Sequence, residues 1–294
     1  MCSQCFDQGR WCLDPAHGSI LLIKGPEIST TLPREVSLRC HDRSTFKIEC
    51  SPTFAKQDDH VLMLAWTDGE YAGSLSTSTS TDGISWAPTT QKLPFTVDSV
   101  SGSPGLAYSP RSGTTFLGWM TGSTKLNVVS TTSPTLDCSA WSSVLTTKLS
   151  KAQKYRLYGV SLAFIEPYLI AAWLGSDYRV TLTSSIDGGA TWRLSVKLDE
   201  AFYGRPNLAV SAKGELVVTW STLAEKMAMR RTCVDVHNLA FGDPEDCEFG
   251  KTKKSADVDW DGEGREWWVV RSKEKKTVQV AIRGNEGGSD GDGW

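Results

Sequence analysis

One pattern of hydrophobic and polar positions recurs along the chain. A short apolar run leads into a polar turn, and a second apolar run follows and ends in tryptophan. The copies cover residues 51–66, 103–119, 160–173, 206–220 and 256–268. Their tryptophans lie roughly fifty residues apart. Each copy predicts a β-hairpin of two half-buried strands, and residues 11–23 predict a similar hairpin near the start.

Short turns rich in serine, threonine, aspartate and glycine follow several of these hairpins. The clearest are STDGISW at residues 80–86 and SSIDGGATW at 184–192, with weaker forms at 135–141 and 289–294. In such a turn the polar side chains hydrogen-bond backbone amides, and glycine adopts positive φ. The tryptophan anchors the turn between strands. The residues expected to build these turns are Asp82, Trp86, Asp187, Gly189 and Trp192.

The repeat predicts an all-β fold. A period of about fifty residues with several short strands per unit is typical of a β-propeller. Because a first unit fits before residue 51, we expect six blades. No linker-like segment separates them, so residues 1–294 are expected to form a single domain. The expected blades are residues 1–50, 51–102, 103–155, 156–201, 202–254 and 255–294.

Composition and charge exclude several classes of function. The net charge is −3, without the basic excess that neutralises phosphates, so no nucleic-acid partner is expected. Apolar runs such as residues 19–23 are too short to span a membrane, and no apolar leader follows Met1. Cys2, Cys5 and Cys12 lack a fourth ligand at the spacing of a zinc site. We therefore expect neither a metal nor a cofactor.

The eight cysteines bear on the compartment. Cys40 and Cys50 bracket one short segment, and Cys233 and Cys247 bracket another, so either pair could close a hairpin loop. The even count favours an extracellular or secreted protein with paired cysteines. Buried thiols in a cytoplasmic protein are the alternative.

Residues 185–192 match the Asp-box pattern Ser-x-Asp-x-Gly-x-Thr-Trp at every position. With this motif and its repeats, the chain resembles the sialidase superfamily of six-bladed Asp-box (BNR repeat) propellers over nearly its whole length. In that family the Asp boxes are structural, and the chemistry lies at the central face, where the first strand of each blade begins. The resemblance therefore implies glycan recognition at that face.

The resemblance also implies an arginine triad that binds a carboxylate through planar guanidinium groups. Arg205, in the segment GRPN, matches the third arginine well. Arg10 and Arg156 are candidates for the first and second arginines, although their segments match less closely. Tyr203 and Tyr158 lie near predicted strand starts, from which a side chain can reach the central pocket.

The catalytic set that the resemblance implies is incomplete. A sialidase uses a tyrosine nucleophile with a glutamate partner, and an aspartate as acid and base. Lys254 stands where the tyrosine is expected, no glutamate of the fourth unit fits the partner role, and Asp98 is a guess for the acid. We therefore expect a lectin-like protein that holds an acidic or neutral sugar near Arg205.

Two alternatives stay open from the sequence. One is a sialidase-type exo-glycosidase with an unrecognised nucleophile such as Tyr155 or Tyr203. The other is a propeller that binds protein partners. Trp260 lies outside the tryptophan repeat, in an acidic segment expected to be a turn, and is a further candidate for ligand contact. The ligand-binding candidates are Arg205, Arg156, Arg10, Tyr203, Tyr158, Lys254 and Trp260.

Overall fold

The fold is known from a computed structural model. Its described backbone comprises residues 5–6, 9–14, 19–23, 35–36, 53–57, 61–68, 74–81, 100–121, 125–133, 140–149, 159–202, 204–211, 213–222, 227–251, 257–260, 266–271 and 278–283. Side chains are described for residues 53, 55, 61–67, 75–81, 102–121, 125–133, 140–149, 159–202, 204–211, 213–222, 228–247 and 258. The described segments contain strands and turns but no α-helix, so the all-β prediction is confirmed.

The described strands form six sheets, in which neighbouring strands are antiparallel. The first holds β1 (Cys5–Phe6), β2 (Gly9–Asp14), β3 (Ser19–Ile23) and β4 (Glu35–Val36). The second holds β5 (Thr53–Gln57), β6 (Val61–Asp68) and β7 (Ser74–Ser80). The third holds β8 (Val100–Ser109), β9 (Thr114–Thr121), β10 (Lys125–Thr131) and β11 (Leu145–Lys148).

The remaining three sheets follow in chain order. The fourth holds β12 (Val160–Ile165), β13 (Tyr168–Leu174), β14 (Arg179–Ser185) and β15 (Val196–Ala201). The fifth holds β16 (Asn207–Val210), β17 (Leu216–Ser221), β18 (Met227–Asp235), β19 (Ala240–Phe241) and β20 (Glu245–Lys251), with β20 paired to β18. The sixth holds β21 (Asp257–Trp260), β22 (Glu266–Arg271) and β23 (Val278–Arg283).

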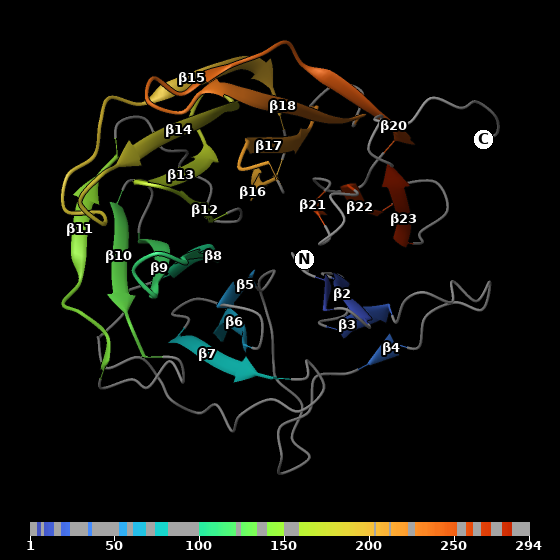
Figure 1. The fold of residues 1–294 in the computed structure, drawn as a ribbon. Coiled ribbons are helices and arrows are strands. Elements are labelled where there is room, and N and C mark those ends of the chain that lie inside the picture. Colours follow the sequence, from blue (N-terminus) through green and yellow to red (C-terminus); the bar gives the residue numbers. More distant parts are fainter. Residues whose placement is uncertain are drawn as a thin grey trace.

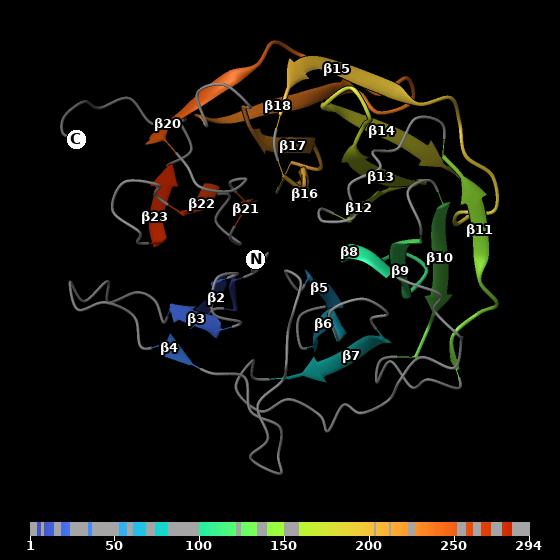
Figure 2. The ribbon, with the colours of Figure 1, turned by 180° about the vertical axis from the view of Figure 1, so that it is seen from behind.

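The sheets surround a common centre, and each presents one strand to it (Figure 1). Of the strands labelled in Figure 1, those nearest the centre are β2, β5, β8, β12, β16 and β21, whereas β4, β7, β11, β15, β20 and β23 lie outermost. Figure 2 shows the same ring from behind. Along the chain, β5 contacts β8, β8 contacts β12, β12 contacts β16 and β16 contacts β21. The starts of the central strands are thereby brought close together.

The predicted hairpins are confirmed. The paired strands are β2 with β3, β5 with β6, β8 with β9, β12 with β13, β16 with β17, and β21 with β22. One boundary differs from expectation, because β8 begins at Val100 and crosses the expected blade boundary at residues 102–103. A register shift between Ser101 and Gly105 lets the strand continue past this point while both of its ends pair with β9.

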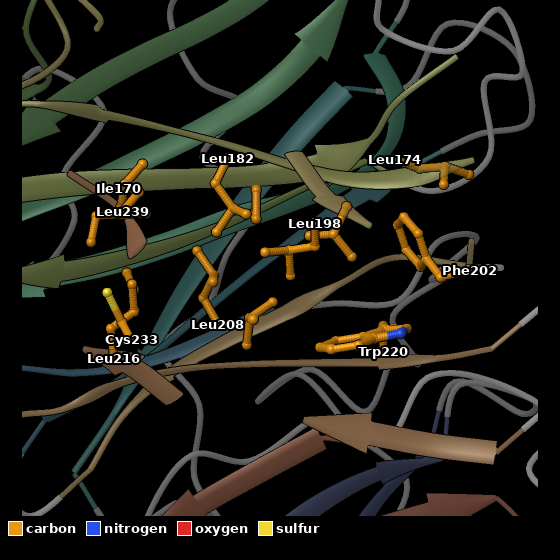
Figure 3. Close-up of a cluster of buried hydrophobic side chains, with 14 residues drawn as sticks. Ile170, Leu174, Leu182, Leu198, Phe202, Leu208, Leu216, Trp220, Cys233 and Leu239 are labelled. Atoms are coloured by element: carbon orange, nitrogen blue, oxygen red, sulfur yellow. The ribbon is translucent and has the colours of Figure 1, made fainter. Parts of the chain in front are cut away.

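The core lies between neighbouring sheets. The repeated tryptophans Trp66, Trp119, Trp173 and Trp220 are all buried, so the repeat places a core residue in each of these sheets. Figure 3 shows the cluster between the fourth and fifth sheets, where Trp220 packs with apolar side chains of both. The second to fifth sheets therefore bury apolar faces against one another, which is the main stabilising interaction of such a ring.

The central strands approach one another closely at small residues. A Cβ atom added to Gly105 would lie 2.8 Å from the Leu162 nitrogen, and one added to Gly159 would overlap the backbone of Ser103. Between the fourth and fifth sheets, the Leu208 amide donates a hydrogen bond to Ser161 Oγ at 3.1 Å. This contact satisfies an N–H group at a strand edge that would otherwise be buried unpaired.

Of the two cysteine pairs that could close a loop, Cys233 and Cys247 are not bonded to each other. Cys233 lies opposite Phe241 of β19, whereas Asp246, the neighbour of Cys247, lies opposite Met229. The two cysteines are therefore offset along β18. Burial raises the pKa of the Cys233 thiol to about 11. This pair therefore gives no support to an extracellular location. The other pair, Cys40 and Cys50, lies outside the described residues.

Membrane insertion through a helix has no support in the described part of the chain. None of its segments forms a helix with the length and apolarity needed to cross a bilayer.

Candidate functional site

Arg205 lies on the segment that leads from the outermost strand of the fourth sheet to the central strand of the fifth. Phe202 anchors this segment, since its side chain is fully buried and its amide donates to the Tyr178 carbonyl at 2.7 Å. Phe202 also forms an isolated bridge with Thr222, just after β17. The segment is thus fixed to both sheets before it reaches Arg205.

Two residues beside Arg205 shape its backbone. Gly204 has a φ of 111°, a conformation that favours glycine, and Pro206 is buried immediately before β16. Arg205 itself is half-buried, and it precedes by two residues β16, which Figure 1 shows nearest the centre in the fifth sheet. A guanidinium group in this position keeps its charge and can bind a carboxylate or hydroxyl oxygens with several N–H groups.

The turn at residues 175–178 borders this segment. The Gly175 amide donates to the Arg179 carbonyl at 2.8 Å, and the Tyr178 amide donates to the Gly175 carbonyl at 3.0 Å. Tyr178 has a φ of 60°, and its side chain is exposed. Tyr178 was not among the residues predicted from the sequence. The residues Gly-Ser-Asp before it favour a turn, and an aromatic residue in a turn is expected to be exposed.

Charged side chains beside the turn are engaged with one another. Asp177 forms an ion pair with Lys197, and Arg179 Nη1 lies 3.8 Å from Asp199 Oδ1. Partial burial acts to raise the pKa of Asp177, but the hydrogen bond and charge of Lys197 outweigh it, so this pKa lies below its ordinary value. The Asp177 carboxylate is thus held ionised next to a cation.

For two of the other predicted ligand-binding residues, Arg10 and Trp260, the structure describes the backbone but not the side chain. Arg10 belongs to β2, where its backbone lies opposite Ile23. Trp260 is the last residue of β21, opposite Glu266, so its placement in a turn is corrected to a strand end. The candidates outside the described residues are Arg156, Tyr158, Tyr203 and Lys254, together with Tyr155 and Asp98.

The opposite end of the fourth sheet carries the turn at residues 185–192. Ser185 Oγ accepts a hydrogen bond from the Gly189 amide at 2.8 Å, and Asp187 Oδ1 accepts one from the Thr191 amide at 2.8 Å. Trp192 Nε1 donates to the Gly189 carbonyl at 3.0 Å. Because this turn follows β14 whereas Tyr178 precedes it, the two lie at opposite ends of that strand. Asp82 and Trp86 lie outside the described residues.

Glycine is required in this turn by conformation and by space. Gly188 and Gly189 have φ values of 70° and 100°. A Cβ on Gly189 would lie 3.3 Å from the Val128 side chain, and one on Gly188 would lie 3.3 Å from Phe116. The turn therefore packs on the third sheet, so it connects two neighbouring sheets.

A polar cluster joins the fourth and fifth sheets at this same end. Tyr168 Oη lies 2.7 Å from His237 Nδ1, and Arg193 donates to the His237 carbonyl at 2.6 Å. The Arg193 guanidinium also lies 5.3 Å from the centroid of the Tyr168 ring. These side chains contact each other across the sheets, so their arrangement is structural. The end with Arg205 and Tyr178 is therefore the candidate site.

Asp187 gives the 185–192 turn a pH dependence. Hydrogen bonds from the Thr191 hydroxyl and amide lower the pKa of Asp187 from 3.8 to about 2. A lowered carboxylate pKa stabilises the folded protein above the unfolded value, near pH 4, and this stabilisation is lost as pH falls through about 2. We expect Asp187→Ala to lower the free energy of unfolding by about 1–2 kcal/mol at pH 7.

Urea denaturation between pH 7 and pH 2 tests this expectation. The difference between wild type and Asp187→Ala should shrink as pH falls below about 4. Asp243→Ala is the control, because Asp243 is exposed between β19 and β20. A difference for Asp187→Ala that stays constant over the whole pH range would contradict the role given to the carboxylate.

Comparisons with known proteins define the fold class. No family model matches the sequence, and no curated protein matches it. Among solved structures, the SapL1 lectin in complex with alpha methyl fucoside aligns with a TM-score of 0.62 and 10% identity, over 94% of this chain and 88% of the lectin. The Hadza microbial sialidase Hz136 aligns with a TM-score of 0.59 and 12% identity, over 92% of this chain.

A third similar structure is the Bacteroides ovatus xyloglucan PUL GH43B, with a TM-score of 0.54 and 13% identity over 80% of this chain. The chain spans 65% of the length of the sialidase and 52% of that of GH43B. At these identities the similarity concerns the fold. The chain is therefore an all-β protein of the propeller type.

Proposed function

We propose that residues 1–294 form a single six-bladed propeller whose 185–192 turn is an Asp box, and that it binds a carbohydrate at the face carrying Arg205. Three observations support this proposal. The six sheets surround one centre, the 185–192 turn is held by its serine, aspartate and tryptophan, and a lectin and a sialidase have similar folds. Fold similarity alone does not define a site, so the position of the proposed binding site is inferred from Arg205.

The position and partial burial of Arg205 are the main support for the proposal. Its backbone is fixed by contacts of Phe202 to two sheets, and its charge is half-buried at the start of a central strand. A segment held in this way loses little backbone freedom on binding, which favours affinity. We infer that Arg205 binds the carboxylate of an acidic sugar or neighbouring hydroxyl groups of a neutral one. The proposed partners in the site are Arg156, Arg10, Tyr203, Tyr158 and Lys254. Trp260 is not among them, because it is the last residue of β21 and the site lies where the central strands begin.

Binding without catalysis is proposed because the described face offers no suitable pair of carboxylates. Glycoside hydrolysis ordinarily needs two, or an activated tyrosine in their place. Near the 202–206 segment, Asp177 is paired with Lys197, Asp199 with Arg179 and Glu200 with Arg231. Lys254 stands at the sequence position proposed for a nucleophilic tyrosine. A sialidase-type exo-glycosidase is the second candidate, supported by the Arg205–Pro206 segment and the similar sialidase fold.

Replacement of Arg205 tests the site. We expect Arg205→Ala to weaken glycan binding at least tenfold, since hydrogen bonds to charged groups contribute about 1.5–3 kcal/mol. Arg205→Lys should recover only part of the affinity, because lysine keeps the charge but loses the planar donor geometry. The readout is a binding titration of each variant against the glycan that the wild type retains most strongly.

Arg111→Ala is the matched control for this titration. The Arg111 side chain is 82% exposed in the β8–β9 turn, where it pairs with Glu166 at 3.5 Å, at the end of the sheets away from Arg205. We expect its binding to equal that of the wild type. Equal binding by Arg205→Ala and wild type would overturn the assignment of this site.

A further inference from the structure

Tyr178 has a backbone conformation that is uncommon for a bulky side chain. Its φ of 60° lies in the left-handed region, where glycine and asparagine are the usual residues. The three hydrogen bonds that hold the turn use backbone atoms of residue 178 and its neighbours. Glycine at this position would make the same bonds without strain. The fold therefore gives no reason for a tyrosine here.

The ring of Tyr178 does not serve the core either. It is 38% exposed, and it belongs to none of the buried clusters between the sheets. The other aromatic residue of this region, Phe202, is fully buried in the cluster between the fourth and fifth sheets. A residue with a strained backbone and a partly exposed aromatic side chain outside the core clusters costs stability, and such positions are concentrated at functional sites.

The connection between Tyr178 and Arg205 is direct. The Tyr178 carbonyl accepts the Phe202 amide at 2.7 Å, and Arg205 follows three residues later. Three residues span at most about 10 Å, so the strained turn and the arginine border one surface. The Asp177–Lys197 ion pair on the preceding residue steadies the turn that carries the ring. The turn that carries the aromatic side chain and the segment that carries the cation are thus neighbours at one end of the fourth and fifth sheets.

We propose that Tyr178 is the aromatic platform of the glycan site. The apolar face of a pyranose ring packs on the tyrosine ring, while the carboxylate or hydroxyl groups of the sugar reach Arg205. A flat ring that also carries a hydroxyl suits a ligand with one apolar face and a polar rim. This inference rests on the proposed carbohydrate-binding function and adds a specificity-determining residue to it.

Replacement by glycine separates binding from stability. We expect Tyr178→Gly to melt at or above the temperature of the wild type, because glycine relieves the strain. The same variant should lose at least tenfold in affinity for the pyranoside that the wild type binds. Tyr178→Phe keeps the ring and should stay within about threefold of wild type. Tyr178→Asn, which also tolerates positive φ, serves as a second ring-free variant.

The probes are a methyl fucoside, a methyl sialoside and a methyl galactoside, titrated with each variant alongside thermal melting. If the wild type binds a probe and Tyr178→Gly and Tyr178→Asn bind it with undiminished affinity, the platform role of Tyr178 is overturned while the carbohydrate-binding function stands. A loss of affinity that tracks a lower melting temperature in both variants would also overturn it, because the ring would then be structural. Absence of binding by the wild type to all three probes would overturn the function and the platform together.

Discussion

Replacement of Gly159 by alanine is expected to destabilise the protein by about 2–5 kcal/mol. Two effects contribute. Gly159 has a φ of 71°, which costs an L-residue about 1–2 kcal/mol, and its added Cβ would overlap the backbone of Ser103. Backbone atoms cannot rotate away as a side chain does, so β8 and the start of β12 would have to separate. The measurement is urea denaturation of the variant and the wild type.

Gly214 supplies the matched control for conformational strain. Its φ of 77° is similar, but nothing lies within 4 Å of its added Cβ. Gly214→Ala should therefore cost only the strain, about 1–2 kcal/mol. The difference between the two variants measures how tightly the third and fourth sheets approach at the centre. Equal losses in the free energy of unfolding for Gly159→Ala and Gly214→Ala would contradict a close contact between the two sheets at Gly159.

Glu200→Ala is expected to lower the free energy of unfolding by about 2–4 kcal/mol. Glu200 of β15 pairs with Arg231 of β18 between the fourth and fifth sheets, and their side chains are 23% and 15% exposed. Removal of the carboxylate leaves the guanidinium largely buried without its counter-charge, which is the costly outcome. Denaturation in urea at pH 7 measures the loss.

The double variant Glu200→Leu with Arg231→Met removes both charges. It separates the net contribution of the ion pair to the free energy of unfolding from the penalty for leaving one charge buried without its partner. Glu200 Oε2 and Arg231 Nε are both buried without a hydrogen-bond partner within the described residues, so the pair is imperfectly satisfied. Apolar side chains suit the neighbouring cluster of Leu198 and Trp220, and the double variant should lie within about 1 kcal/mol of wild type. Strictly additive losses in the double variant would contradict this description.

Much of the fold follows from local sequence patterns. The hairpins and the burial of Trp66, Trp119, Trp173 and Trp220 were predictable because each repeats the same alternation and packs in the same place. Whether Cys233 and Cys247 pair could not be decided from the sequence, because spacing along the chain does not reveal the register of β19 and β20 on β18. Pairing registers depend on the whole sheet.

The candidate site was predictable only in part. Arg205 was identified from its segment, but its support comes from Phe202 bridging two sheets, a contact that no local pattern encodes. Tyr178 was missed because a tyrosine carries no sequence signal for positive φ. That conformation is imposed by hydrogen bonds to Gly175 and Phe202, and the second of these lies in a distant segment.

The central claim is that this propeller binds a carbohydrate without cleaving it. Incubation of the wild-type protein on a glycan array, read for both retained protein and loss of terminal sugars, tests it most directly. We expect retention on a defined class of glycans with every terminal sugar intact. Loss of terminal sugars would identify a glycosidase, and absence of retention on all glycans would contradict carbohydrate binding.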